Sequence, residues 1–156
     1  MGISITVMST LFEQVHKNVK HSVGISEKVN SDQDVKTCIC HRALMIFKLD
    51  LILFAYKQKV DEHRFILHGK NALASYLFTQ YNVPFLEAKT LSLNDALTII
   101  LPEINGEEIS QKFITALLNI DGVTFHFHER KVHCVNKIII DESEWDPDLC
   151  DTLFLK

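Results

Sequence analysis

The sequence predicts an α+β fold, in which several helices pack on a small antiparallel sheet that includes a C-terminal β-hairpin. Helical periodicity with N-capping residues recurs along the chain up to Gly122, whereas the chain beyond it alternates apolar and polar residues with the period of a strand. The length of 156 residues, with 47% hydrophobic and 23% charged residues, fits one globular domain over residues 1–156.

Five helices are predicted from apolar residues that recur every three or four positions behind a capping residue. The first begins with a capping box formed by Thr10 and Glu13. Proline disfavours continuation of a helix, so the third is expected to end before Pro84 and the fourth before Pro102. The predicted helices, with their caps, are 10–21 (Thr10), 35–47 (Ser31), 71–81 (Asn71), 92–101 (Ser92) and 105–121 (Asn105).

Three other segments complete the first two thirds of the chain. Residues 22–34 form a polar stretch, which we expect to be a loop. The periodicity of residues 48–58 does not decide between continuation of the preceding helix and a strand. The sequence HRFILHG at 63–69 is predicted to be a short strand that ends at Gly69.

The C-terminal hairpin is predicted from two apolar segments that flank a polar turn. In VTFHFH, at 123–128, Val123 and Phe125 fall on one face of a strand and the histidines on the other. VHCVNKIII, at 132–140, is rich in the β-branched residues typical of strands. The intervening ERK is expected to form the turn.

The same hairpin raises the question of a metal site. A three-residue turn would place His126 opposite Cys134, and a four-residue turn would place His128 opposite His133. The CICH sequence at 38–41 offers further zinc ligands, but its spacing is not that of known zinc motifs, and nothing in the sequence brings the two regions together. We therefore predict no metal site and no cofactor.

The four cysteines and the apolar segments indicate where the protein resides. The cysteines do not form the dense framework of a small secreted domain, so reduced thiols and a cytoplasmic location are expected. The longest apolar run, at 43–56, is too short to span a bilayer and contains Lys48 and Asp50, so no membrane association is predicted. Gly2 and Thr6 match the short myristoylation pattern, but no polybasic segment accompanies it.

The sequence also argues against catalysis and against nucleic-acid binding. The nucleophile motif G-x-S-x-G and glycine-rich phosphate loops are absent, so we predict that the protein is not an enzyme. Residues 1–102 carry a net charge of +2, whereas residues 103–156 carry −6. An acidic C-terminal third repels the phosphate backbone of a nucleic acid.

The strongest functional signal is the segment DESEWDPDLCD at 141–151. It contains six carboxylates, one tryptophan and no lysine or arginine. The sequence allows a solvated segment whose tryptophan enters the core, or an acidic surface with an aromatic anchor, since tryptophan is enriched at binding hot spots. On the second interpretation the partner-binding residues are Asp141, Glu142, Glu144, Trp145, Asp146, Asp148 and Asp151.

These patterns predict a non-enzymatic protein-binding module with a basic protein partner. The most concrete form is an inhibitor or immunity-type protein that neutralises a nuclease-like toxin, because a nuclease cleft must be basic to hold phosphates. The alternative is a small metal-binding or thiol enzyme that uses the histidines and cysteine of the hairpin.

Overall fold

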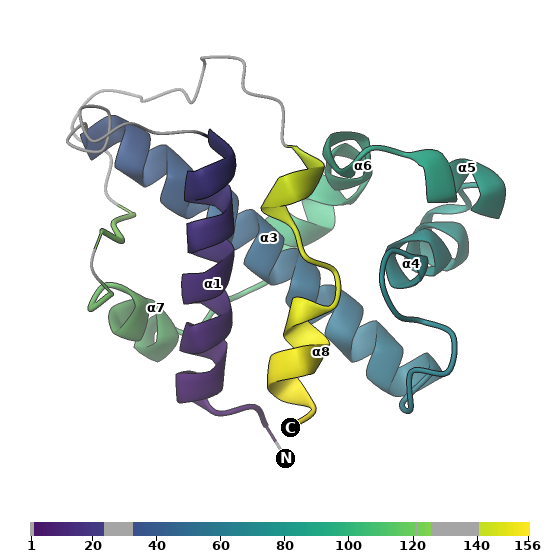
Figure 1. Ribbon diagram of the computed structural model, residues 1–156, viewed down its shortest axis with the longest axis horizontal. Coiled ribbons are helices and arrows are strands. Elements are labelled where there is room, and N and C mark those ends of the chain that lie inside the picture. Colours follow the sequence, from purple (N-terminus) through teal and green to yellow (C-terminus); the bar gives the residue numbers. More distant parts are fainter. Residues whose placement is uncertain (1, 24–32, 121, 126–140) are drawn as a thin grey trace. The chain divides into compact units, whose positions relative to one another are not determined.

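The structure is a computed structural model that describes residues 2–23, 33–120, 122–125 and 141–156 (Figure 1). In these ranges it contains seven α-helices, one short 3₁₀ helix and no strand, so the predicted α+β fold is wrong and the described chain is all-α. The elements are α1 (Ile5–Val23), α3 (Gln33–Val60), α4 (Asn71–Tyr81), α5 (Phe85–Thr90), α6 (Leu93–Gly106), α7 (Gln111–Leu117), η1 (Glu142–Glu144) and α8 (Leu149–Phe154).

The chain divides into two compact units, and each unit combines segments that are distant in sequence. Unit 1 comprises Met1–Phe47 and Glu108–Trp145, and unit 2 comprises Lys48–Glu107 and Asp146–Lys156. The boundary falls inside α3, so one continuous helix contributes to both units. The single domain expected from the sequence stays a prediction.

Helix α3 explains why residues 48–58 lack a clear period. Ile46, Phe47, Leu49, Ile52 and Leu53 are all buried, and together they occupy most of the circumference of the helix. The buried positions spread over more than half of the helix and include the polar Asp50 and Lys57, so they give no clear amphipathic stripe. Residues 48–58 are therefore helical, which the periodicity did not decide.

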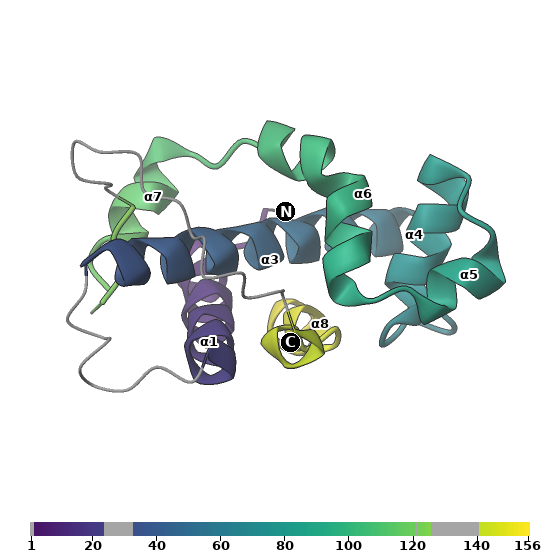
Figure 2. The same ribbon diagram turned by 90° about the horizontal axis from the view of Figure 1, so that it is seen from above.

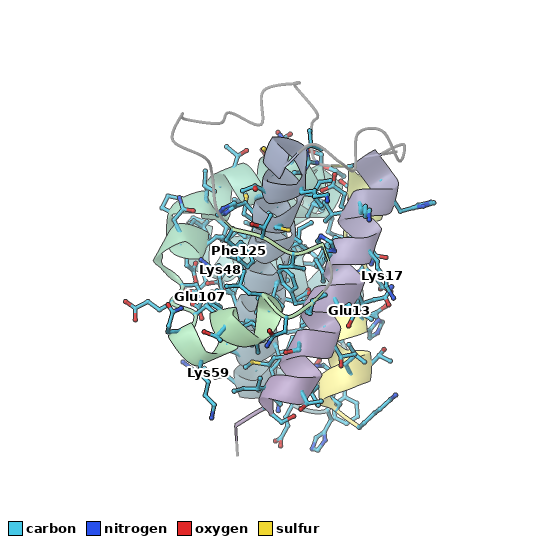
Figure 3. The ribbon with its side chains drawn as sticks, turned by 90° about the vertical axis from the view of Figure 1, so that its left-hand side faces the viewer. Glu13, Lys17, Lys48, Lys59, Glu107 and Phe125 are labelled. Carbon is cyan, nitrogen blue, oxygen red and sulfur yellow. The ribbon has the colours of Figure 1, made fainter. Side chains whose placement is uncertain are left out.

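In unit 1, α1 packs against α7 and η1, and its aromatic residues join those of α3 (Figure 1). The ring of Phe12 lies 5.9 Å from that of Phe47, and Phe47 stacks on Phe113 of α7 at 5.2 Å. Phe125, which is labelled in Figure 3, contacts Phe12 of α1 and His41 of α3. The core of unit 1 thus contains a cluster of four phenylalanine rings.

In unit 2, α4, α6 and α8 surround the C-terminal half of α3 (Figure 2). Tyr56 of α3 contacts the ring of Tyr76 in α4 at 5.2 Å, and Tyr76 in turn donates a hydrogen bond to Glu103 of α6. Phe154 of α8 contacts Phe54 of α3 at 5.1 Å, edge to face. Helix α5 packs against α4.

Three predicted helix ends are corrected by the structure, and one of them is the start of α4, where the N-cap residue is Lys70 and not the predicted Asn71. Helix α1 begins at Ile5, where Ser4 accepts a hydrogen bond from the Val7 N–H, so Thr10 is an interior residue and not a cap. Helix α6 begins after Ser92, as predicted, but continues through Pro102. An interior proline costs about 3 kcal/mol, and burial of apolar residues on both sides of it offsets this penalty: Ile100 and Ile104.

The helix predicted over 105–121 is the clearest error among the helices. Asn105 and Gly106 end α6, and α7 starts only at Gln111, where Ser110 accepts a hydrogen bond from the Phe113 N–H at 3.2 Å. The backbone of Glu107 is extended between the two helices. Ser110 is therefore the cap of α7, and Phe113 and Leu117 of that helix are buried in unit 1.

The predicted strands are also absent from the described chain. Residues 63–69 form a turn-rich loop between α3 and α4, and the described part of the first hairpin strand, 123–125, is not a strand. Residues 126–140, with the remainder of the predicted hairpin, lie outside the described residues, as do 24–32 of the predicted polar loop. The ends of that loop belong to α1 and α3.

Candidate functional site

The structure distributes the seven predicted partner-binding residues between the surface and the interior. Asp141, Asp146 and Asp148 are exposed, whereas Trp145 is only 5% exposed and Glu144 is fully buried. The unit boundary lies between Trp145 and Asp146, so the acidic segment contributes to both units. The two remaining residues, Glu142 and Asp151, are half-buried.

Trp145 belongs to the core of unit 1, so its predicted role as a solvent-facing aromatic anchor is wrong. The preceding residues form η1, which packs against α1. The Trp145 N–H donates a hydrogen bond to the Glu142 carbonyl, which closes this short helix and directs the indole inward. The sequence left this alternative open, and the high density of carboxylates did not exclude it.

Glu144 also serves the fold of unit 1. Its Oε1 atom forms an ion pair with the guanidinium of Arg42 in α3. Within the described chain the other oxygen, Oε2, has no hydrogen-bond donor. Burial raises the pKa of Glu144, and the neighbouring Arg42 opposes that increase. A carboxylate in this position stabilises the native arrangement of α3 and η1 and is not available to a partner.

Asp151 has the corresponding role in unit 2. Its Oδ2 atom accepts hydrogen bonds from Lys57 at 2.8 Å and from Arg64 at 2.9 Å, and Oδ1 accepts a second one from Arg64 at 3.1 Å. Burial alone would raise the pKa of Asp151, but the hydrogen bonds and charges of Arg64 and Lys57 outweigh it and lower the pKa. Asp151 thus joins α8 to α3 and to the loop that follows it.

That loop, residues 61–70, is the feature that the sequence prediction missed. The carboxylate of Asp61 accepts three backbone hydrogen bonds, from the N–H groups of Phe65, Ile66 and Leu67, at 2.8–3.0 Å. Leu67 is buried, but Phe65 is 79% exposed and Ile66 is 67% exposed. Successive side chains of a strand point to opposite faces, so three consecutive apolar residues place apolar side chains on both faces. A single strand here would leave one of those faces exposed to water, and this was a signal in the sequence against the predicted strand.

Two exposed carboxylates of the acidic segment lie beside this loop. Asp148 Oδ1 accepts a hydrogen bond from the Gly69 N–H at 2.7 Å, and Asp146 Oδ1 accepts one from the Asp148 N–H at 3.1 Å. Gly69 has a φ of +58°, a conformation that glycine adopts readily. Within unit 2, Asp148 of the predicted acidic site therefore contacts, at Gly69, the same loop that carries the exposed Phe65 and Ile66.

The charge of unit 2 is consistent with an acidic surface. Its segments contain seven Lys or Arg residues and ten Asp or Glu residues, for a net charge of −3. Asp151 engages two of the cations, Lys57 and Arg64, with a single carboxylate. Without these three residues, unit 2 has nine carboxylates and five cations, an excess of four negative charges.

A second group in unit 1 combines a thiol and an imidazole. The Cys40 Sγ lies 3.6 Å from His16 Nε2, donates to the Gly122 carbonyl at 3.7 Å and accepts from the Thr124 N–H at 3.3 Å. Burial raises the pKa of Cys40 and lowers the pKa of His16. Both groups are therefore held neutral, whereas a nucleophilic cysteine requires a thiolate.

We expect Cys40 and Cys150 to resist alkylation in the native protein. Both are free and buried, and burial also raises the pKa of Cys150. Incubation with iodoacetamide at pH 8, followed by peptide mass spectrometry, should show neither residue modified until urea is added. Rapid modification of Cys40 in the folded protein would contradict a buried neutral thiol.

Among the other candidate metal and thiol residues, Cys38 is disulfide-bonded, so the expectation of reduced thiols is wrong for this residue. Within the described ranges, no three His, Cys, Asp or Glu side chains are grouped closely enough to hold a metal ion. The hairpin candidates lie outside the described residues: His126, His128, His133 and Cys134.

No helix in the described chain has the length and apolar character needed to cross a membrane. Comparison with known proteins gave no further information on the chain: no family model, no curated protein and no solved structure matches it.

Proposed function

We propose that this chain is a non-enzymatic protein-binding module whose acidic C-terminal third binds a basic protein partner. The single observation that supports this most is the pair Asp146 and Asp148, which remains exposed while Glu144 and Asp151 are engaged in ion pairs. Exposed carboxylates accelerate and orient the encounter with a basic surface.

The most concrete form of the proposal is an inhibitor or immunity-type protein that covers the cleft of a nuclease-like toxin. Such a cleft is lined by cations that hold phosphates. A protein surface with exposed carboxylates is negatively charged, as the phosphates of a nucleic acid are, so it can bind in this cleft in place of the substrate. Trp145 and Glu144 are not part of the proposed contact set, because their side chains are buried in unit 1.

The proposal includes a cytoplasmic location, supported by the free thiols of Cys40 and Cys150. The disulfide at Cys38 is less common in that compartment, so fractionation of the native cells is a direct test. Recovery of the protein from the cytosolic fraction is expected. Recovery from a secreted or lumenal fraction would contradict this part of the proposal.

We expect salt-sensitive association that depends on Asp146 and Asp148. The intact chain, immobilised and exposed to extract from its native cells, should retain a basic protein that rising salt releases. Asp146→Asn with Asp148→Asn preserves the acceptor oxygens and removes both charges. We expect it to weaken binding about two- to thirtyfold, since each exposed ion pair contributes roughly 0.2–1 kcal/mol.

The matched control removes the same charge elsewhere in unit 2, through Glu87→Gln with Asp95→Asn, two exposed residues of α5 and α6. It should leave the affinity unchanged. If no basic protein is retained even at low salt, or if neutralising Asp146 and Asp148 has no more effect than the control, the proposed function is wrong.

A further inference from the structure

The loop at 61–70 holds two large apolar side chains in water. Phe65 and Ile66 are 79% and 67% exposed, and the ring of His63 contacts that of Phe65 edge to face at 5.8 Å. Exposure of a Phe and an Ile side by side forgoes about 1.5–3 kcal/mol of burial for each. The contacts that fix this loop must therefore come from other residues.

Those contacts are polar, and they fix the backbone closely. Asp61 accepts three backbone N–H groups of the loop. Arg64 donates to the Asp61 and Glu62 carbonyls, both at 2.9 Å, as well as to Asp151. Its guanidinium also lies over the Phe54 ring, 5.4 Å from the centroid. Hydrogen bonds of two side chains, Asp61 and Arg64, thus fix the conformation of the loop.

Arg64 also adopts a conformation that a non-glycine residue avoids. Its φ of +57° lies in the left-handed region, which costs roughly 1–2 kcal/mol for a residue with a Cβ atom. The bidentate bond to Asp151 and the two carbonyl contacts offset this cost. As a result, the next two residues, Phe65 and Ile66, project outward while Leu67 returns to the core.

A rigid loop that presents apolar side chains is well suited to binding. Binding free energy is reduced by the entropy of ordering loops and side chains, and a loop that is already fixed avoids much of that loss. Large side chains that insert into a desolvated pocket contribute most of the affinity of an interface. Trp145, the aromatic residue that the sequence predicts for this role, is buried in unit 1.

We propose that Phe65 and Ile66 are the apolar anchor of the partner-binding surface, and that they insert into an apolar pocket with a basic rim on a protein partner. This inference rests on the proposed function and names the residues that give the complex its affinity. The rim of the pocket is expected to be basic because two carboxylates accompany the loop. Asp148 contacts the loop at Gly69, and Asp146 contacts Asp148.

The surroundings of the anchor favour this partner over a lipid surface or a second copy of the chain. Lys59 and Lys70 flank the loop, but the exposed Glu62, Asp146 and Asp148 would repel anionic lipids. A stable dimer buries about 800 Å² on each partner, whereas an aromatic side chain supplies roughly 150–250 Å². Two protruding side chains therefore suit insertion into a pocket of a partner better than the large interface of a homodimer.

The test compares two pairs of substitutions that remove similar exposed apolar surface. Phe65→Ser with Ile66→Ser removes the anchor. Phe78→Ser with Leu86→Ser removes exposed residues of α4 and α5, of which Leu86 is 78% exposed. The binding partner is the basic protein released by salt, identified and purified, and the readout is the dissociation constant of its complex with the full-length chain.

We expect the anchor substitutions to weaken binding at least tenfold at constant salt, with an unchanged melting temperature and an unchanged dependence on salt. The control pair should bind like the wild type. Asp61→Ala, which leaves both anchor side chains in place but removes the hydrogen bonds that fix them, should weaken binding to an intermediate degree. That result separates preorganisation of the loop from the area of contact.

The outcomes separate failure of the anchor from failure of the proposed function. Salt-sensitive binding that the anchor substitutions do not alter overturns the anchor and leaves the function standing. Retention of no basic protein overturns both. Co-sedimentation with phosphatidylserine vesicles, or dimers seen by light scattering, that disappear when Phe65 and Ile66 are replaced would overturn the assignment of a protein pocket in favour of a membrane or a second copy.

Discussion

Replacement of Arg42 by methionine is expected to lower the free energy of unfolding by about 3–5 kcal/mol. Glu144 is fully buried and faces this guanidinium. Without Arg42 its carboxylate would be charged and unpaired in the core, or would have to take up a proton. Urea unfolding followed by circular dichroism measures the loss.

The double variant Arg42→Met with Glu144→Leu should recover most of that stability, because a buried ion pair and a well-packed apolar pair often contribute similarly. Lys17→Met is the matched control, since Lys17 is an exposed cation on α1 (Figure 3). It should change stability by less than about 0.5 kcal/mol. If Arg42→Met is as mild as this control, the ion pair does not stabilise unit 1.

Replacement of Asp151 by alanine is expected to have a comparable effect in unit 2, about 3–5 kcal/mol. Lys57 and Arg64 both donate to this carboxylate, and both cations are largely buried. Its removal leaves two buried positive charges facing each other, and it also releases the loop that carries Phe65. The sequence predicted Asp151 as a contact residue, so loss of stability instead of affinity distinguishes the two roles.

The same carboxylate should make stability depend on pH. The pKa of Asp151 is lower in the folded protein than in the unfolded chain, where it is about 3.9. Its contribution is therefore fully present above about pH 5 and is lost as the pH falls through the folded-state pKa. Asp151→Asn should flatten this acid limb of the stability profile, whereas Glu62→Gln, at an exposed site, should leave it unchanged.

The helices were predictable where local signals determine them. Ser92 caps α6 through the Asp95 N–H, and α4 spans the predicted 71–81 although Lys70, and not the predicted Asn71, is its N-cap residue. The prediction failed where two local signals compete, as at Asn105 and Ser110, because either residue can cap a helix and only packing selects between them. It also failed at Pro102, where burial on both sides of the proline outweighs its penalty.

The candidate site was less predictable, because its decisive contacts connect distant residues. Glu144 pairs with a residue 102 positions earlier, and Asp151 with residues 94 and 87 positions earlier. The high density of carboxylates in residues 141–151 suggested an exposed segment. A carboxylate can nevertheless be buried when it pairs with a buried cation. The sequence of a short segment shows how many charges it carries. It does not show that Arg42, Lys57 and Arg64 lie beside two of them in the fold.

These long separations have a consequence for synthesis on the ribosome. A ribosome adds roughly 5–20 residues per second, so Arg42 precedes its partner Glu144 by about 5–20 s. Throughout that interval, α3 lacks the charge that its guanidinium needs, and its second half lacks the aromatic contact of Phe154. Neither unit can complete its core until residues 141–156 have been translated, so until then the apolar residues of α3 lack part of the contacts that bury them.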